Sequence, residues 1–213
     1  MSPLLIRLHE RLAQHQPSAV SGWNYPEAAV LLAITREQEP QLILTRRADH
    51  LNTHSGQVAF PGGKRDPEDA SLLETALREA WEEIRLPPEQ VEVLGQLGEL
   101  ISLHGIRVTP FVGLIPPDLD LQPCEQELDQ VFKVPLHWLM QDLRTHTDQI
   151  QVQDQTWYVP SYQWQEHTLW GLSAMMLVEL LQAGLGLDIC LQQCPEGPVI
   201  RRAVRPFPPQ DKV

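Results

Sequence analysis

The sequence predicts a single α/β domain in which helices cover both faces of a mixed sheet. Almost continuous apolar runs of strand length, such as 28–35, are typical of strands that are buried on both faces. Two longer segments, 71–84 and 169–183, have the length and the apolar content of helices. The 213 residues are enough for one sizeable core. Strands that alternate with helices in this way predict a layered α/β architecture.

The first elements follow one another closely along the chain. Leucines at three- and four-residue steps predict a helix over 4–15. The apolar run 28–35 is predicted to be a buried strand, and a polar turn separates it from a second strand over 41–47, so a hairpin is expected. A short strand over 57–60 ends at the Pro-Gly-Gly sequence of residues 61–63, which predicts a turn.

The clearest helix is predicted over 71–84. Ser71 and Glu74 have the spacing of a capping box, which marks a helix start. Thr75 lies off the apolar stripe of this helix, so we expect its side chain outside the buried face. The buried stripe is predicted to consist of Leu73, Ala76, Leu77, Ala80 and Ile84, which recur at three- and four-residue steps.

The second half of the chain alternates strands, loops and two further helices. The segments 91–102 and 107–115 predict strands on either side of His104 and Gly105. The apolar segment 169–183 predicts a long helix. The other predicted elements are an acidic loop over 116–127, a strand over 131–134 that leads into a short helix over 136–143, and β-like segments over 156–159 and 162–165.

Prolines gather at the C-terminal end of the chain. The 19 prolines are otherwise dispersed and read as turn residues. Five of them fall within 195–213, which predicts an extended or partly disordered tail. The predicted organisation is therefore one domain over 1–194, beginning with a helix, followed by a proline-rich tail over 195–213.

The composition argues against several classes of protein. The formal charge is −12, from 28 acidic and 16 basic residues, whereas general binding of nucleic acid or anionic membranes uses clustered Lys and Arg. No apolar run approaches the ~18–20 residues of a membrane helix, and the start of the chain lacks a signal-peptide pattern. The 3 cysteines have no zinc-site spacing and are expected to be reduced thiols. We therefore expect a cytoplasmic protein, monomeric or homodimeric, without nucleic-acid or membrane partners.

Three glutamates give the helix over 71–84 an acidic face. Glu79, Glu82 and Glu83 lie at positions i, i+3 and i+4, and Arg78 can pair with Glu82. A solvated acidic surface is one interpretation of this face. A metal site is the other, because a glycine turn that permits close backbone approach precedes the helix and clustered carboxylates suit Mg²⁺ or Mn²⁺. Substrate phosphates often complete Mg²⁺ coordination, so a metal site would point to phosphate chemistry.

Residues 63–86 resemble the Nudix box of the Nudix hydrolases, G-x5-E-x7-R-E-U-x-E-E-x-G-U, where U is apolar. Asp69 stands where the box has Glu, and eight residues instead of seven separate it from Arg78. Arg85 replaces the final Gly, so we expect a slightly altered helix exit, at a cost on the order of 1 kcal/mol. The residues that match the box are Gly63, Arg78, Glu79, Glu82, Glu83 and Leu86.

A second resemblance, over about 28–183, is to the coenzyme A pyrophosphatases within that superfamily. Their flanking motif is L-T-x-R-S…H-x-G-Q-V-x-F-P-G-G-x-x-D…T-A-L-R-E-A-x-E-E-I-G-L, and the extra box residue belongs to it. Ala48 stands here in the position of Ser. The matching residues are Leu44, Thr45, Arg47, His54, Gly56, Gln57, Val58, Phe60, Pro61, Gly62, Gly63, Asp66 and the segment 75–80.

The resemblance implies a Nudix-type α/β/α sandwich with a mixed sheet and a metal site on the acidic helix. Glu79 and Glu83 would be metal ligands, with Glu82 as an additional one. Arg78 would orient a glutamate of the site. The cofactor would be Mg²⁺ or Mn²⁺.

Four residues outside the acidic helix complete the candidate site. Glu127 of the acidic loop would be a further metal ligand or the general base, with a plain solvated acid as the alternative. Arg47 would bind a substrate phosphate through its guanidinium, with an ordinary surface arginine as the alternative. The backbone of Gly62 and Gly63 would lie against the substrate. His54 is expected to have a structural role.

The resemblance implies hydrolysis of the pyrophosphate bond of coenzyme A or an acyl derivative, giving 4′-phosphopantetheine (or its acyl form) and adenosine 3′,5′-bisphosphate. One alternative is a Nudix hydrolase of ADP-ribose or a nucleoside triphosphate. The other is an inactive Nudix domain that only binds nucleotides. Tyr162, Trp164 and Trp170 either pack in the core or contact such a substrate, by stacking on adenine or lining a pantetheine channel.

Overall fold

The parallel pair of β1 (Glu27–Thr35) and β7 (Arg107–Ile115) forms the centre of the fold. The computed structural model describes residues 2–21, 24–50, 55–152 and 155–202. The two strands belong to a mixed sheet of eight strands with the path β3-β2-β1-β7-β5, in which β4 pairs with β1, β6 with β7 and β8 with β2. Its other strands are β2 (Gln41–Arg47), β3 (Val58–Ala59), β4 (Gly62–Lys64), β5 (Glu92–Gln96), β6 (Leu100–Ile101) and β8 (Leu128–Pro135).

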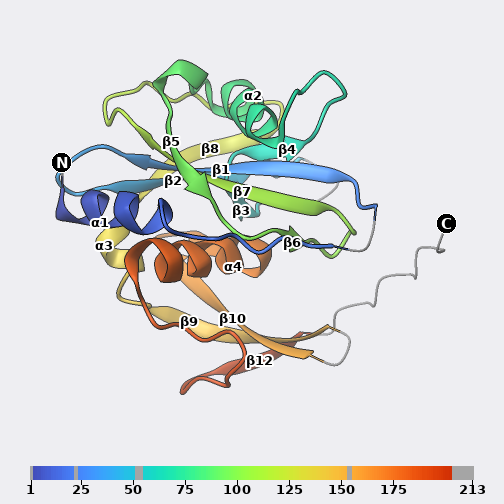
Figure 1. Ribbon diagram of the computed structural model, residues 1–213. Coiled ribbons are helices and arrows are strands. Elements are labelled where there is room, and N and C mark those ends of the chain that lie inside the picture. The colour runs from blue at the N-terminus through green and yellow to red at the C-terminus, as the bar shows by residue number, and fades with distance from the viewer. Residues whose placement is uncertain (1, 22–23, 51–54, 153–154, 203–213) are drawn as a thin grey trace.

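Helices cover both faces of this sheet. Figure 1 shows α2 (Leu72–Ile84) on one face and α1 (Pro3–Leu12) and α4 (Gly171–Glu179) on the other. The predicted α/β/α sandwich with a mixed sheet is therefore confirmed. Within the described ranges, none of the helices is long and apolar enough to cross a membrane. The smaller helical elements are a 3₁₀ turn at Pro88–Gln90, α3 (Leu136–Leu139) and a π-helical continuation of α4 at Leu180–Gly184.

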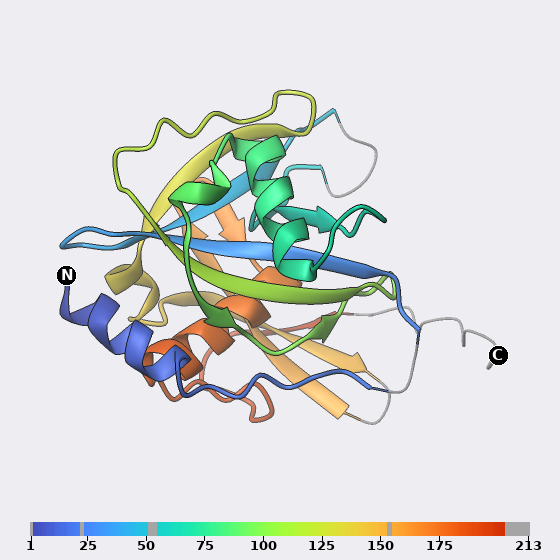
Figure 2. The ribbon, with the colours of Figure 1, turned by 45° about the horizontal axis from the view of Figure 1, so that its top comes forward.

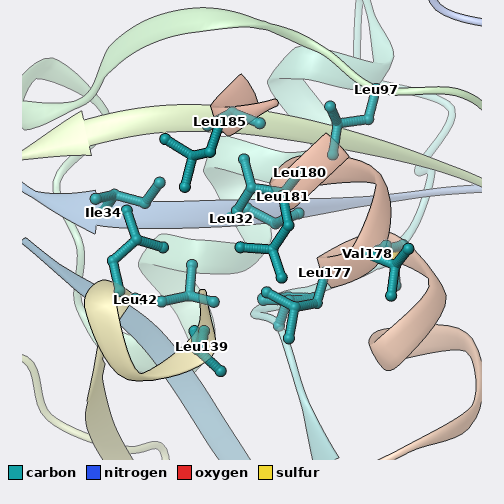
Figure 3. Close-up of a cluster of buried hydrophobic side chains, with 14 of the residues drawn as sticks. Leu32, Ile34, Leu42, Leu97, Leu139, Leu177, Val178, Leu180, Leu181 and Leu185 are labelled. Carbon is teal, nitrogen blue, oxygen red and sulfur yellow. The ribbon is translucent and has the colours of Figure 1, made fainter. Parts of the chain in front are cut away.

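The two faces of β1 belong to two separate hydrophobic clusters, which explains why its sequence is apolar almost throughout. Ala29, Leu31 and Ala33 lie in one cluster with the buried side of α2. Leu32 and Ile34 point the other way, into a larger cluster with leucines of β2, α3 and α4 (Figure 3). Sheet strands that are buried on both faces have no polar face to present, so the period-two alternation of a half-exposed strand is absent.

A four-stranded sheet that the sequence pattern does not predict lies beyond α4 (Figures 1 and 2). The β-like segments at 156–159 and 162–165 are parts of one strand, β10, because Pro160 and Ser161 continue the pairing with β9 instead of ending it. Helix α4 is buried between the two sheets, which is consistent with its apolar sequence. The strands of the second sheet are β9 (Arg144–Val152), β10 (Gln155–Trp164), β11 (His167–Leu169) and β12 (Val199–Arg202), in the order β11-β10-β9-β12.

Strand β12 lies within the proline-rich segment 195–213. Val199–Arg202 pairs in parallel with β9, from Val199 opposite Thr147 to Arg202 opposite Ile150. Ordered structure therefore continues past residue 194, where the predicted domain ends. That boundary stays a prediction, since residues 203–213 lie outside the described ranges.

Two predicted elements differ in length from those observed. The predicted strand over 91–102 is divided into β5 and β6, because the amide of Gly98 between them donates a hydrogen bond to Glu179 of α4 (2.6 Å). The predicted helix over 136–143 ends at Leu139, and Asp142 has a positive φ of 51°, which a continuing helix does not allow.

Helix α2 is followed by Arg85, whose backbone adopts the left-handed conformation that a glycine commonly adopts at this position. Arg85 has φ 58° and ψ 32°, its amide bonds to the carbonyl of Trp81 (3.0 Å), and the amide of Leu86 bonds to that of Ala80 (3.3 Å). The expectation of an altered exit is therefore wrong. The Arg85 guanidinium lies 5.6 Å from the centre of the Trp81 ring, a cation–π contact that offsets part of the backbone strain.

Replacing Arg85 by Gly is expected to raise the free energy of unfolding by up to about 1 kcal/mol, because Gly adopts the left-handed conformation without a Cβ penalty. Urea unfolding of the two proteins measures the difference. Arg85→Ala is the matched control, since it removes the contact with Trp81 and keeps the penalty, so it should bring no gain. Equal stability of the Gly and Ala variants would contradict this account of the helix exit.

Candidate active site

Helix α2 begins with the predicted capping interactions. The Ser71 hydroxyl accepts a hydrogen bond from the Glu74 amide (3.1 Å), and the Glu74 carboxylate accepts one from the Ala70 amide (2.7 Å). These bonds satisfy backbone donors that a helix start leaves unpaired. They fix where the helix starts and therefore which way its glutamates point.

Arg78 is the centre of an ion-pair network at the start of the site. Its guanidinium forms two hydrogen bonds with Asp69, one from Nε and one from Nη2 (both 3.0 Å). Nη1 bonds to Glu79 and to Glu82 (both 3.1 Å), and Nη2 also bonds to the carbonyl of Lys64 (3.0 Å). The predicted pairing of Arg78 with Glu82 is present. The two parallel hydrogen bonds to Asp69 fix the orientation of the Arg78 guanidinium. Arg78 in turn orients the carboxylate of Glu79 through its own hydrogen bond.

Asp69, which stands where the box has a glutamate, is nearly inaccessible to solvent. Besides Arg78, it accepts hydrogen bonds from the Asp66 amide (3.0 Å) and the Thr75 hydroxyl (2.8 Å). These bonds, led by those from Arg78, hold the pKa of Asp69 well below its usual range. Thr75 is itself fully buried, so its predicted position outside the buried face is wrong. Thr75 is buried because the loop before α2 places Asp69 over it, where the Thr75 hydroxyl donates its hydrogen bond.

The three glutamates of α2 differ in their exposure. Glu83 is 5% exposed, whereas the side chain of Glu82 is 55% exposed and that of Glu79 is 17% exposed. Burial raises the pKa of Glu83 to about 7 and also raises that of Glu79. Glu83 accepts a hydrogen bond from the Gly62 amide (3.0 Å), which favours its charged form. The acidic face is therefore not a uniformly solvated surface.

Gly62 and Gly63 belong to β4, which pairs with β1, and they lie directly against the acidic face. A side chain at Gly63 would overlap with the carboxylate of Glu79. A Cβ at Gly62 would lie 2.6 Å from the Cα of Val30, and φ at Gly62 is +156°. Only glycines therefore let the backbone lie this close to Glu79 and Glu83.

The acidic loop before β8 places Glu127 beside these carboxylates. The Cys124 amide bonds to the carbonyl of Glu83 (2.8 Å), which fastens the loop to the end of α2. The Ala48 amide bonds to the carbonyl of Glu127 (2.9 Å), which fastens it to the end of β2. The charge of Glu127 raises the pKa of both Glu79 and Glu83, and the charge of Arg47 lowers that of Glu83. The structure thus brings Glu79, Glu83, Glu127 and Arg47 into one electrostatic site.

The two arginines at the end of β2 have different partners. Arg46 pairs with Asp49 and Asp129 (both 2.6 Å). Arg47 points into a cavity of about 400 Å³, and within the part of the chain that the structure describes it has no ion-pair partner. Its Nε is buried without a hydrogen bond. A guanidinium that lines a cavity and forms no direct ion pair there is suited to bind an anion.

This cavity is formed by parts of the chain far apart in sequence. Arg47, Gly62 and Gly63 contribute to one part of it, and the residues around Ser102–His104 and the start of α4 contribute to another. A larger hollow of about 710 Å³ lies on the outer side of α2 and borders Asp69 and Arg78, but neither Arg47 nor the glycine turn. The smaller cavity contains Arg47 and the two glycines that lie against Glu79 and Glu83, so it is the candidate substrate site.

The donor set is suited to a hard divalent cation. Glu79, Glu83 and Glu127 offer carboxylate oxygens, and a cation would offset the unfavourable charge on the buried Glu83. Within the described ranges, no three acidic, His or Cys side chains are already gathered as a complete ligand set. Mg²⁺ needs only one or two carboxylates together with water and substrate oxygens, so the residues fit this ion. Glu82, at the surface and paired with Arg78, is the most peripheral of the predicted ligands.

Chelator-treated protein is expected to lose stability as the pH rises from about 5 to about 8. The folded protein keeps the Glu83 proton up to a pKa of about 7, whereas the unfolded chain releases it near 4.5. The folded state binds more protons over this interval, so stability is full below it and falls as the pH rises through it, by at most about 3 kcal/mol. Urea unfolding in EDTA at several pH values measures this fall. Glu83→Gln should flatten it, and an equally steep fall in that variant would contradict the assignment to Glu83.

Some site features have no signal in the sequence. The pairing of Asp69 with Thr75 and the contribution of α4 to the cavity depend on tertiary packing. Of the aromatic candidates, Tyr162 is buried and bonds to Asp142 (2.6 Å), and Trp164 packs edge-to-face on Trp138 (4.9 Å), so both are structural. Trp170 lines the cavity. His54 lies outside the described residues.

Comparisons with known proteins show the family and the fold of this chain. The model of the NUDIX domain matches residues 25–155. A protein named "Uncharacterized Nudix hydrolase NudL" from Yersinia enterocolitica is 44% identical over 172 residues, covering 81% of this chain and 88% of the relative. The protein of the same name from Photorhabdus laumondii is 45% identical over 159 residues, covering 75% and 85%. A crystal structure of a MutT/nudix family protein from Enterococcus faecalis shares the fold, with a TM-score of 0.50, 14% identity and 88% coverage of both chains.

Proposed function

Because the chain belongs to the NUDIX domain family, we propose that it hydrolyses the pyrophosphate bond of coenzyme A or acyl-coenzyme A. The protein is a Nudix hydrolase, an enzyme that acts on nucleoside diphosphate derivatives. Water is added across the bond between the two phosphates. The products are 4′-phosphopantetheine, or its acyl form, and adenosine 3′,5′-bisphosphate.

One observation carries this proposal. Arg47, for which the described residues supply no ion-pair partner, lines the same cavity as the glycine turn that touches Glu79 and Glu83. A guanidinium on one side and metal-binding carboxylates on the other suit the two phosphates of a diphosphate. The motif around Arg47 and the Pro-Gly-Gly turn is the part of the sequence that resembles the coenzyme A subgroup, and it supports this choice of substrate.

The proposed roles follow from the contacts of each residue. Glu79 and Glu83, with Glu82 as an additional ligand, would hold Mg²⁺ or Mn²⁺; Nudix hydrolases generally use divalent metal ions. When bound, the ion would neutralise the charge that develops on the phosphates. Arg78 orients Glu79 through its hydrogen bond.

The remaining roles belong to residues at the rim of the acidic cluster. Glu127 accepts the proton of the attacking water in this proposal, because it lies close to Glu79 and Glu83 without a fixed side-chain partner among the described residues. Arg47 binds a phosphate oxygen, and Gly62 and Gly63 leave room for the diphosphate beside the carboxylates.

The proposed setting is a cytoplasmic enzyme with a small-molecule substrate. The three cysteines are unpaired, as expected for a reducing compartment. The net charge of −12 does not favour nucleic acid as a partner. A monomer or a homodimer is proposed for the assembly.

A panel of substrates tests the function. Coenzyme A, acetyl-coenzyme A, NADH, ADP-ribose and 8-oxo-dGTP are assayed with Mg²⁺ and with Mn²⁺, and the products are separated by chromatography. We expect turnover of the coenzyme A compounds into the two named products. Turnover of ADP-ribose without turnover of coenzyme A would favour the other Nudix substrates. Absence of metal-dependent turnover on all five would favour a nucleotide-binding module.

Arg47→Ala is expected to raise KM for coenzyme A about tenfold or more, because a charge-assisted bond to phosphate is lost. Steady-state kinetics measures the change. Arg36→Ala is the matched control, since Arg36 pairs with Glu92 at the surface away from the cavity, and its KM should match the wild type. An unchanged KM for Arg47→Ala would remove Arg47 from the phosphate site.

A further inference from the structure

The cavity beside the acidic cluster has exposed apolar side chains at its edge. Trp170 is 38% exposed and Leu103 is 58% exposed, and both line the cavity. They come from different parts of the chain, the residue before α4 and the segment between β6 and β7. Exposed apolar groups that converge on one cavity indicate a surface that a ligand covers.

The body of the cavity is apolar as well, and its charge is of one sign. Among the described residues that line it, Arg47 and Lys64 are the two with a full charge, and none is a carboxylate. Its walls are formed mainly by Val30, Phe60, Ile106, Val108, Leu172 and Met176. A ligand that matches this lining has a phosphate at one end and a long uncharged arm of largely apolar character.

Trp170 contacts an arginine of the second sheet. The guanidinium of Arg202 in β12 lies 5.6 Å from the centre of the Trp170 ring. Its Nε donates a hydrogen bond to Asp148 of β9 (2.8 Å), and Asp148 is completely buried. A buried carboxylate fixes the arginine, and the arginine packs on the indole. A residue of strand β12 therefore contacts a residue that lines the cavity.

We propose that this cavity binds the uncharged apolar arm of the substrate, that Trp170 contacts this arm, and that Arg202 is the residue that positions Trp170. The arm is a pantetheine thioester, in keeping with the proposed function on which the inference rests. The adenosine portion of the substrate lies outside this cavity.

Binding of the two product halves separates this proposal from turnover. S-Butanoyl-4′-phosphopantetheine carries the arm, and adenosine 3′,5′-bisphosphate lacks it. By calorimetry, Trp170→Ala is expected to weaken binding of the first about tenfold, because apolar contact area is lost, and to leave the second within twofold. Trp170→Phe should retain most of the affinity. Trp81→Ala is the matched control, since Trp81 is 43% exposed on α2 away from this cavity, and it should change neither affinity.

Three results would overturn the proposal. Trp170→Ala could lose the same affinity for both ligands, or it could lose affinity for the bisphosphate alone, which would place adenine on Trp170. The third result is that the wild type does not bind S-butanoyl-4′-phosphopantetheine. If the wild type binds the arm through Trp170 but does not hydrolyse coenzyme A, the proposed function fails and the inference stands.

Arg202 is tested through the same ligands. Arg202→Gln is expected to weaken binding of the acyl arm about threefold without changing binding of the bisphosphate, and Arg202→Lys should restore it in part by keeping the cation. Thermal unfolding is measured alongside. A lower Tm for Arg202→Gln with an unchanged dissociation constant for the arm would show a structural role only and would overturn the positioning role.

Discussion

Replacing Glu83 by Gln is expected to lower kcat by at least about 100-fold while the protein stays folded. Glu83 is the buried carboxylate at the centre of the site, close to Glu79 and Glu127 and bonded to the Gly62 amide. The amide side chain has nearly the same shape and can still accept the bond from Gly62. The variant therefore removes a charge from the proposed metal site with little change in packing, and a loss of this size is typical of a key electrostatic contact.

Steady-state kinetics with Mg²⁺ or Mn²⁺ measures the loss of kcat, and circular dichroism verifies the fold. Glu68→Gln is the matched control, because Glu68 is an exposed acid in the loop before the same helix and should leave kcat unchanged. If Glu83→Gln kept kcat within a few-fold of the wild type, Glu83 would not be a metal ligand, and the acidic face of α2 would have another purpose.

Replacing Asp69 by Ala is expected to lower the free energy of unfolding by about 3 kcal/mol. Asp69 is buried and accepts four hydrogen bonds, two of them from Arg78. Removing one partner of a buried ion pair leaves the other charge poorly compensated, which typically costs ~3–5 kcal/mol. The lower end applies here, because Arg78 is partly solvated and keeps Glu79 and Glu82.

Urea unfolding at pH 7 measures this loss, and Asp66→Ala is the control. Asp66 lies 3.7 Å from Arg78 but is mostly exposed, so its removal should cost well under 1 kcal/mol. The pKa of Asp69 is depressed by Arg78, so its contribution is complete above the unfolded pKa near 4 and is lost as the pH falls below it. The difference between wild type and Asp69→Ala should therefore shrink in acid, and a constant difference would contradict the ion-pair explanation.

The parts of the fold that follow from local periodicity were predictable. The run 28–35 and the segment 41–47 are strands close to their expected bounds, and α2 begins and ends within one residue of the expected 71–84. The polar strand β9 and the short β12 were not predictable, because neither has an apolar pattern strong enough to indicate a buried strand. Their stability comes from pairing with each other and with β10, which is a tertiary property.

The candidate site shows the same division. Arg78, Glu79, Glu82 and Glu83 come from one helix, so their relative positions are fixed by 3.6 residues per turn and could be read from spacing. The resemblance favoured Arg47 over its neighbour Arg46, but spacing could not decide between them, because neighbouring residues of a strand point to opposite sides and the sequence does not state which side holds the cavity. The structure places acids beside Arg46 and leaves Arg47 at the cavity.

The sequence by itself determined the acidic helix, the glycine turn before it and the family to which both belong. Tertiary structure alone decided which carboxylates are buried and what lies opposite them. Pairing of β2 with β8 places Arg47 opposite Leu128, next to Glu127, and pairing of β4 with β1 places Gly62 and Gly63 against Glu79 and Glu83. The physical reason is the distance along the chain between the residues involved. Spacing within a helix depends on neighbouring residues only. Burial depends on strands and loops distant in sequence, and the burial of Glu83 is what raises its pKa to about 7.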